Sequence, residues 1–286
     1  MLPDSLRFIV SLIVIASFAL VQSFARLGPC AVFSSPLETS QQVSEDSNSE
    51  IARLTAQLKS SDEEERRNAT VMLVALDTAA AIPALTAASN DTSERVRALA
   101  ITGLAQLGDP SLVPIIAARL AQDKKPFVRK AAAYGLGKLH SSEGTPALVA
   151  ALKDKDSEVR GAAAVALGDY ADAAAIAPLT QALEDKSEFV RAQSARALGV
   201  NGRAARAAVP LLIRRLASDK DQEVKRQAAT ALGRIGEQSA LSALKQAELD
   251  RDPYLSQAAS EAIKMITDAG ANNQGRRVES ANDLAH

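Results

Sequence analysis

The chain has 286 residues, of which 57 are alanine, six are Phe, three are Tyr and none is Trp. Because alanine favours helices and disfavours strands, this composition excludes an all-β fold. The net charge of −1 excludes a globally basic nucleic-acid binder, the single cysteine excludes an intramolecular disulfide, and two histidines argue against His-rich metal centres.

An apolar run opens the chain. Residues 8–25 carry no charge, Arg7 precedes them and Arg26 follows, and Ser23 and Ala25 supply the small residues of a cleavage site. We therefore expect residues 1–25 to be a signal peptide or, alternatively, a retained membrane anchor, because 18 apolar residues lie at the lower limit for a bilayer span. Either reading predicts an exported (periplasmic or extracytoplasmic) or membrane-anchored protein.

Two flanking segments lack apolar periodicity. Cys30 stands in Leu27-Gly28-Pro29-Cys30, which has the Leu of a lipoprotein box but Pro where a small residue is expected, so a free thiol is the simpler interpretation. Residues 26–49 are predicted to be a disordered linker and residues 269–286 a disordered tail.

Between these flanks, one unit recurs seven times. Its reference position is occupied by Arg66, Arg97, Arg129, Arg160, Arg191, Lys225 and Ser256, with spacings of 31, 32, 31, 31, 34 and 31 residues. An apolar residue precedes this position in six units, a small residue follows three positions later, and Leu or Ile follows seven positions later. These offsets share one stripe of a helix, so each unit contains an amphipathic helix.

A second helical stretch precedes this helix in the units that begin near Pro83, Pro114, Pro146, Pro178 and Pro210. Proline fits the first turn of a helix because its missing N–H is not needed there. An Asp-rich tract between the two helices supplies turn and capping residues. Gly137, Gly168, Gly199 and Gly233 lie within the later helix, where close packing against a neighbouring helix is the expected reason for glycine.

Each unit is therefore a helical hairpin that buries its apolar face only by stacking on its neighbours. The motif Asp-x-Asp-x-x-Val-Arg-x-x-Ala-x-x-x-Leu-Gly, complete at Asp154–Gly168, resembles the HEAT repeats, in particular the short phycobilisome-lyase-type (PBS lyase) HEAT-like repeats. The resemblance covers residues 50–268. It implies an all-α fold, a right-handed α-solenoid (superhelix) of about seven HEAT-like hairpins.

The repeated Asp and Arg invite either a functional or a structural interpretation. In the family that this chain resembles, the pair forms a ladder of hydrogen bonds between units, which suits a planar guanidinium. We therefore assign a structural ladder to Asp91, Arg97, Asp123, Arg129, Asp154, Arg160, Asp185 and Arg191. Lys225 is expected to continue it, whereas Ser256 ends it in the last unit.

A binding surface is expected beside the core stripe of the later helices, which the resemblance places on the concave face. Residues 191–234 hold ten basic and three acidic residues, which suggests a patch for an acidic protein surface or anionic lipid headgroups, although an ordinary solvated face explains it equally well. The candidate partner-binding residues are Lys130, Tyr134, Lys138, Arg196, Arg203, Arg206, Arg214, Arg226 and Arg234.

Three classes of function are disfavoured. Nucleic acid is a poor partner because the patch lacks interleaved aromatic residues. Resemblance to deoxyhypusine hydroxylase, a HEAT-repeat di-iron enzyme, carries no metal ligands here, since no His-Glu pair is present. No nucleophile elbow or phosphate-binding glycine loop occurs either. We expect no enzyme, no cofactor and no metal, but a scaffold that binds a protein partner; the alternative is an accessory or chaperone subunit of a chromophore-lyase-like system.

Overall fold

The structure is a computed structural model that describes residues 36–169 and 171–283, with side chains from residue 46 to residue 269 apart from 170. It divides into two units, residues 1–48 and 49–286. The predicted signal peptide or anchor and Cys30 lie outside the described residues. Within the described part of the chain, no helix is both long and apolar enough to cross a membrane.

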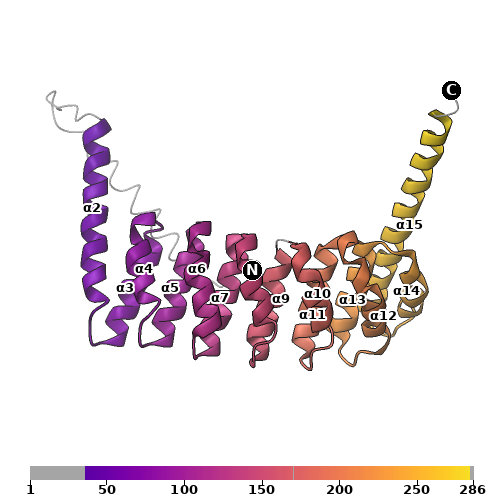
Figure 1. The fold of residues 1–286 in the computed structure, drawn as a ribbon, viewed down its shortest axis with the longest axis horizontal. Helices are drawn as coiled ribbons and strands as arrows, with labels where there is room; N and C mark the ends of the chain where they lie inside the picture. The colour runs from indigo at the N-terminus through magenta and orange to yellow at the C-terminus, as the bar shows by residue number, and fades with distance from the viewer. Residues whose placement is uncertain (1–35, 170, 284–286) are drawn as a thin grey trace, which may run out of the picture. The chain divides into compact units, whose positions relative to one another are not determined.

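Seven helical hairpins make up the described chain, which confirms the predicted all-α solenoid (Figure 1). The first helices of units one to seven are α2 (Pro36–Gln57), α4 (Ile82–Ala88), α6 (Val113–Gln122), α8 (Thr145–Ala151), α10 (Ile176–Ala182), α12 (Val209–Ser218) and α14 (Leu241–Ala247). The second helices are α3 (Glu63–Ala75), α5 (Glu94–Gln106), α7 (Pro126–Leu139), α9 (Ser157–Asp169), α11 (Glu188–Val200), α13 (Gln222–Ile235) and α15 (Pro253–Asp283).

Local sequence explains where these helices begin. Pro83, Pro114 and Pro210 occupy the first turn of α4, α6 and α12, and a 3₁₀ turn precedes each of these helices. Several second helices, though not α7 or α11, have side-chain caps: the Ser93 hydroxyl accepts a hydrogen bond from the Arg95 N–H, and the Asp221 carboxylate accepts one from the Val224 N–H.

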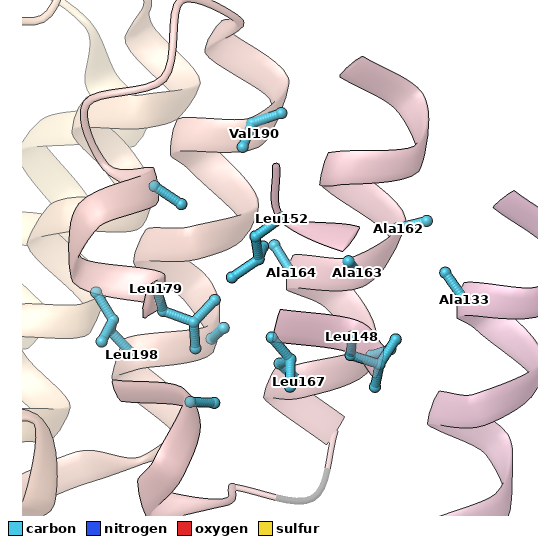
Figure 2. Packing of buried hydrophobic residues seen from close by; sticks show 14 of the residues in the cluster. Ala133, Leu148, Leu152, Ala162, Ala163, Ala164, Leu167, Leu179, Val190 and Leu198 are labelled. Atoms are coloured by element: carbon cyan, nitrogen blue, oxygen red, sulfur yellow. The ribbon is translucent and has the colours of Figure 1, made fainter. Parts of the chain in front are cut away.

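The core is built from the stripe that the repeat predicts. Val159 and Leu167 of α9 are fully buried, as are Val190 and Leu198 of α11. Figure 2 shows Leu167, Val190 and Leu198 in one cluster with Leu179 of α10 and with Ala162, Ala163 and Ala164 of α9. Leucine and valine supply the buried apolar area, while alanine allows adjacent helices to approach.

Second helices pack very closely on one another. A Cβ atom on Gly168, Gly199 or Gly233 would lie 3.0, 2.9 or 2.7 Å from the Cα atom of an alanine in the next second helix. This confirms close packing as the reason for these glycines. Contacts between successive second helices are also more extensive than contacts between successive first helices.

The structure differs from the sequence prediction at both flanks. Helix α2 begins at Pro36, inside the predicted linker (26–49), and α15 continues to Asp283, through most of the predicted tail (269–286). Apolar periodicity reports the burial of one face, and a helix without a buried face lacks it. The absence of that pattern therefore did not exclude a helix in either segment.

Candidate protein-binding surface

The Asp and Arg of successive units form bidentate pairs. Arg97 Nε and Nη2 donate to the two carboxylate oxygens of Asp123 at 2.7 and 2.9 Å, and Nη1 donates to the Asp91 carbonyl at 2.9 Å. The structure brings all eight predicted ladder residues into this arrangement and adds Arg66 and Asp219 at its ends. The pairs are Arg66–Asp91, Arg97–Asp123, Arg129–Asp154, Arg160–Asp185 and Arg191–Asp219.

Each ladder carboxylate stays ionised because of its partners. Burial raises the pKa of Asp123, but hydrogen bonds from Arg97 and from the Lys125 N–H outweigh it, so the pKa lies below its ordinary value. The hydrogen bond to Asp123 in turn raises the pKa of Arg97. These groups satisfy one another within the turns, which is the arrangement that the structural interpretation of the pair expects.

The ladder stops before the last junction. Lys225 makes no ion pair among the residues with described side chains, so the prediction that it continues the ladder was wrong. Its expected partner Asp250 accepts a hydrogen bond from the Asp252 N–H, as every ladder aspartate does from the residue two positions on, but it has no arginine partner among the described side chains. Arg226, the next residue, pairs with Asp252 at 2.9 Å. A lysine ammonium lacks the planar fork that reaches a carboxylate and a carbonyl at once.

Many arginines of the predicted basic patch already have acidic partners. Arg196 lies 3.8 Å from Asp169, Arg214 pairs with Glu184, and Arg226 pairs with Glu223 at 2.7 Å. The acids come from neighbouring units or from the same helix, and most lie outside the stretch 191–234 whose charge was counted. The local excess of positive charge is therefore smaller than the sequence suggested.

Three arginines of the set, Arg203, Arg206 and Arg234, make no ion pair within the described side chains. Arg203 and Arg234 line a groove of about 570 Å³ beside α13 and α15. Glu237 lines the same groove, which offsets part of its positive charge.

The other three candidates meet in one place. Lys130, Tyr134 and Lys138 of α7 line a groove of about 510 Å³ together with Arg95 and Leu99 of α5. Phe127 also lines this groove. Phe127 is 50% exposed and Tyr134 is 44% exposed. We call this site, lined by Arg95, Leu99, Phe127, Lys130, Tyr134 and Lys138, the α5–α7 groove.

Sequence reasoning missed Phe127 although a signal was present. An aromatic residue stands two positions before the reference position in three units: Phe127, Phe189 and Tyr254. Phe189 fills the space where a side chain at Gly161 would lie, and the Tyr254 ring lies 5.9 Å from the Arg226 guanidinium. Phe189 and Tyr254 thus both lie near the preceding second helix. Where that helix has Gly161 opposite Phe189, α5 has buried Ala98, which lines the same groove as Phe127.

Comparisons with known proteins agree with the repeat. A family profile described as HEAT repeats matches residues 51–137, 116–199 and 176–264, more than half of the chain. No curated protein matches the sequence.

Solved structures with TM-scores above 0.5 share the fold. YibA from Escherichia coli is 23% identical, with a TM-score of 0.59 and 77% of this chain and 81% of that chain covered. An engineered protein is 25% identical, with a TM-score of 0.52 and coverage of 77% and 72%. The complex of CpcE and CpcF of phycocyanin lyase from Nostoc sp. PCC7120 is 22% identical, with a TM-score of 0.48 and coverage of 86% and 98%.

Proposed function

The chain belongs to the HEAT-repeat family, and we propose that it is a non-catalytic scaffold that binds a partner protein on the face formed by its second helices. Repeat arrays of this kind present extended surfaces rather than enclosed active sites. Closer packing of the second helices bends an array toward them, which supports the choice of this face as the concave one.

The α5–α7 groove is the observation that carries this proposal. Exposed aromatic residues are enriched where proteins bind one another, and Phe127 and Tyr134, seven residues apart on α7, both line one groove on the second-helix face. The chain has only nine aromatic residues. Two of them at one exposed site therefore single it out from the rest of the surface.

The pKa shifts support a non-catalytic role. In the part of the chain with described side chains, every group with a displaced pKa belongs to the ladder, to a capping bond or to a local ion pair. Shifted groups that are not partners of one another, gathered in a cleft, would suggest catalysis. The shifts here have structural causes.

Affinity purification from the native source tests the proposal. The full chain is compared with the double variant Phe127→Ala/Tyr134→Ala and with Tyr254→Ala, a matched control that removes an exposed aromatic residue elsewhere on the second-helix face. We expect the double variant to lose a partner protein that the control retains. Retention of every partner by the double variant would contradict this site.

Export or tethering is part of the proposal and is supported by the apolar run at residues 8–25. N-terminal sequencing of the native protein tests it: a start at Arg26 supports a cleaved signal peptide, and a start at Met1 with membrane association supports an anchor. A start at Met1 in a soluble fraction argues against both.

An accessory role in protein modification is a second candidate. The α5–α7 groove has a volume in the range of small-molecule sites, which favours it. Expression with bilins followed by absorbance spectroscopy distinguishes the two, because a bound chromophore absorbs visible light and a bare scaffold does not.

A further inference from the structure

We infer that the occupant of the α5–α7 groove is an acidic segment of a partner protein that inserts one large apolar side chain between Phe127 and Tyr134. This inference rests on the proposed scaffold function and adds the chemistry of the partner. Three properties of the groove support it: a shallow apolar floor, an unburied aromatic pair and a rim of one sign of charge.

Small side chains form the floor. Ala98 of α5 and Ala131 and Gly135 of α7 line the groove. Ala98 and Gly135 are buried whereas both rings are exposed, so this floor is recessed relative to the rings. Thr102 also lines the groove, but its hydroxyl donates to the Ala98 carbonyl, so the floor is mainly apolar and suits an inserted apolar side chain.

Among the described residues, the aromatic pair of the groove remains exposed. Phe189, at the equivalent position two units later, is half-buried against Gly161. Phe127 occupies the same place in its unit, where Ala98 stands at the position of Gly161, and it is more exposed than Phe189, at 50%. An apolar side chain of a partner would bury the exposed Phe127 ring.

The charged residues that line the groove are all basic. Among the described residues, Arg95, Lys130 and Lys138 line it, and no Asp or Glu does. Lys130 lies 3.6 Å from Glu158, while Arg95 and Lys138 make no ion pair within the described side chains. The groove beside α13 and α15 differs because Glu237 lines it. Charge complementarity therefore favours carboxylates on either side of the inserted apolar residue.

Peptide display tests this chemistry. Random 12-residue peptides are selected on the full chain and counter-selected on Phe127→Ala/Tyr134→Ala. We expect the selected peptides to carry a net negative charge and at least one Leu, Ile, Met, Phe or Trp. Selection of neutral or basic peptides, or of none that distinguish the two proteins, would overturn the inference.

Binding of the best selected peptide is then measured by fluorescence anisotropy. We expect Kd to rise about tenfold or more for Tyr134→Ala and for Lys138→Glu, and to stay unchanged for Tyr134→Phe. Lys124→Glu is the matched charge control, because Lys124 is exposed on the turn before α7 and does not line the groove. Equal Kd values for Lys138→Glu and Lys124→Glu would remove the electrostatic part of the inference.

Two further probes distinguish a peptide ligand from nucleic acid and from a lipid surface. A 12-nucleotide single-stranded DNA and anionic phospholipid vesicles are tested on the same proteins, and binding of either that depends on Tyr134 as strongly as peptide binding would overturn the choice of a peptide. The outcomes also separate the two proposals. If the native partner depends on Phe127 and Tyr134 but selected peptides are not acidic, the scaffold function stands and this inference fails.

Discussion

At the scale of single residues, Arg129 shows why the repeated charged pair holds units together. Its side chain is 6% exposed and donates to Asp154 at 2.7 Å through both Nε and Nη2, while Nη1 bonds the Asp123 carbonyl of its own unit. One side chain thus joins two turns. The geometry is bidentate and largely withdrawn from water, unlike that of a surface ion pair.

Substitution of this arginine tests the ladder. Arg129→Ala leaves the Asp154 carboxylate with the Asp156 N–H as its remaining hydrogen-bond donor, so we expect a loss of about 3 kcal/mol in the free energy of unfolding. Urea unfolding followed by circular dichroism measures it. Arg214→Ala is the control, because that residue and Glu184 are both more than half exposed, and we expect less than about 1 kcal/mol there. Equal losses would show that the ladder is no stronger than a surface pair.

Single residues also show what sequence can and cannot predict here. The ladder was predictable because Asp and Arg keep a fixed spacing within every central unit, and because HEAT repeats, which this spacing resembles, pair the two residues between units. The role of Arg226 was not, because Lys225 occupies the ladder position beside it, and its partner Asp252 stands two residues after the ladder aspartate. The partner of Arg214 could have been found, since Glu184 stands 30 residues earlier, about one repeat away.

At the scale of helices, close contact between second helices explains the alanine-rich composition. Gly233 of α13 lies against Ala262 of α15, and the equivalent glycines of α9 and α11 lie against Ala197 and Ala231. Each interface places a residue without a side chain against one with a single methyl group. Regular stacking over many units therefore selects small residues at one register position.

A larger side chain at that position is expected to be destabilising. Gly233→Ala gains about 1 kcal/mol of helix propensity, but its Cβ would lie 2.7 Å from the Ala262 Cα, where overpacking costs about 1–3 kcal/mol. Because backbone blocks the new methyl group, we expect a net decrease in thermal stability. Gly135→Ala is the control, as its nearest contact is a side-chain carbon at 3.2 Å, and its melting temperature should change less. A rise for Gly233→Ala would show that the helices separate freely.

The short turns between units were harder to predict than the helices. Ala173–Ala175 forms a 3₁₀ turn before α10, although a run of alanines fits a continuous helix equally well. Asp172 fixes the turn by accepting hydrogen bonds from the Ala174 N–H and from the Thr145 hydroxyl of the preceding unit. The second bond depends on the tertiary structure, which periodicity within one unit does not describe.

At the scale of the whole array, the ladder predicts acid sensitivity. The pKa values of Asp91, Asp123, Asp154, Asp185 and Asp219 all lie below the ordinary value of 3.8, because hydrogen bonds from arginine and backbone N–H groups outweigh burial. These carboxylates therefore bind protons at a higher pH in the unfolded chain than in the folded chain. The stabilisation is complete at neutral pH and is lost as the pH falls below about 4 and through the folded-state pKa values.

Urea unfolding between pH 6 and pH 3 measures this loss. We expect the midpoint to change little above about pH 5 and to fall steeply below it. The double variant Arg129→Met/Asp154→Asn removes one pair, so its midpoint should fall less over the same range. An unchanged acid dependence in that variant would show that other carboxylates control acid unfolding.

The array should also be unevenly stable, because the junction between units six and seven lacks the ladder. Lys225 makes no ion pair among the described side chains, and Asp250 keeps only its local N–H partner there. Arg226 and Asp252 replace the pair at a more exposed position, where such contacts contribute less. Stability in a repeat array is a sum of unit and interface terms, so the weak interface should let α14 open more often than α10.

Introducing an arginine at position 225 tests whether the missing ladder pair weakens this junction. In Lys225→Arg, the guanidinium occupies the ladder register between the Asp219 carbonyl and the Asp250 carboxylate, so we expect amide hydrogen exchange in α14 to slow about fivefold, the effect of about 1 kcal/mol. Lys220→Arg is the matched control because Lys220 is exposed and outside that register, and exchange should stay unchanged. Equal exchange rates in α14 and α10 of the native chain would contradict a weak junction, and no slowing in Lys225→Arg would show that the missing ladder is not its cause.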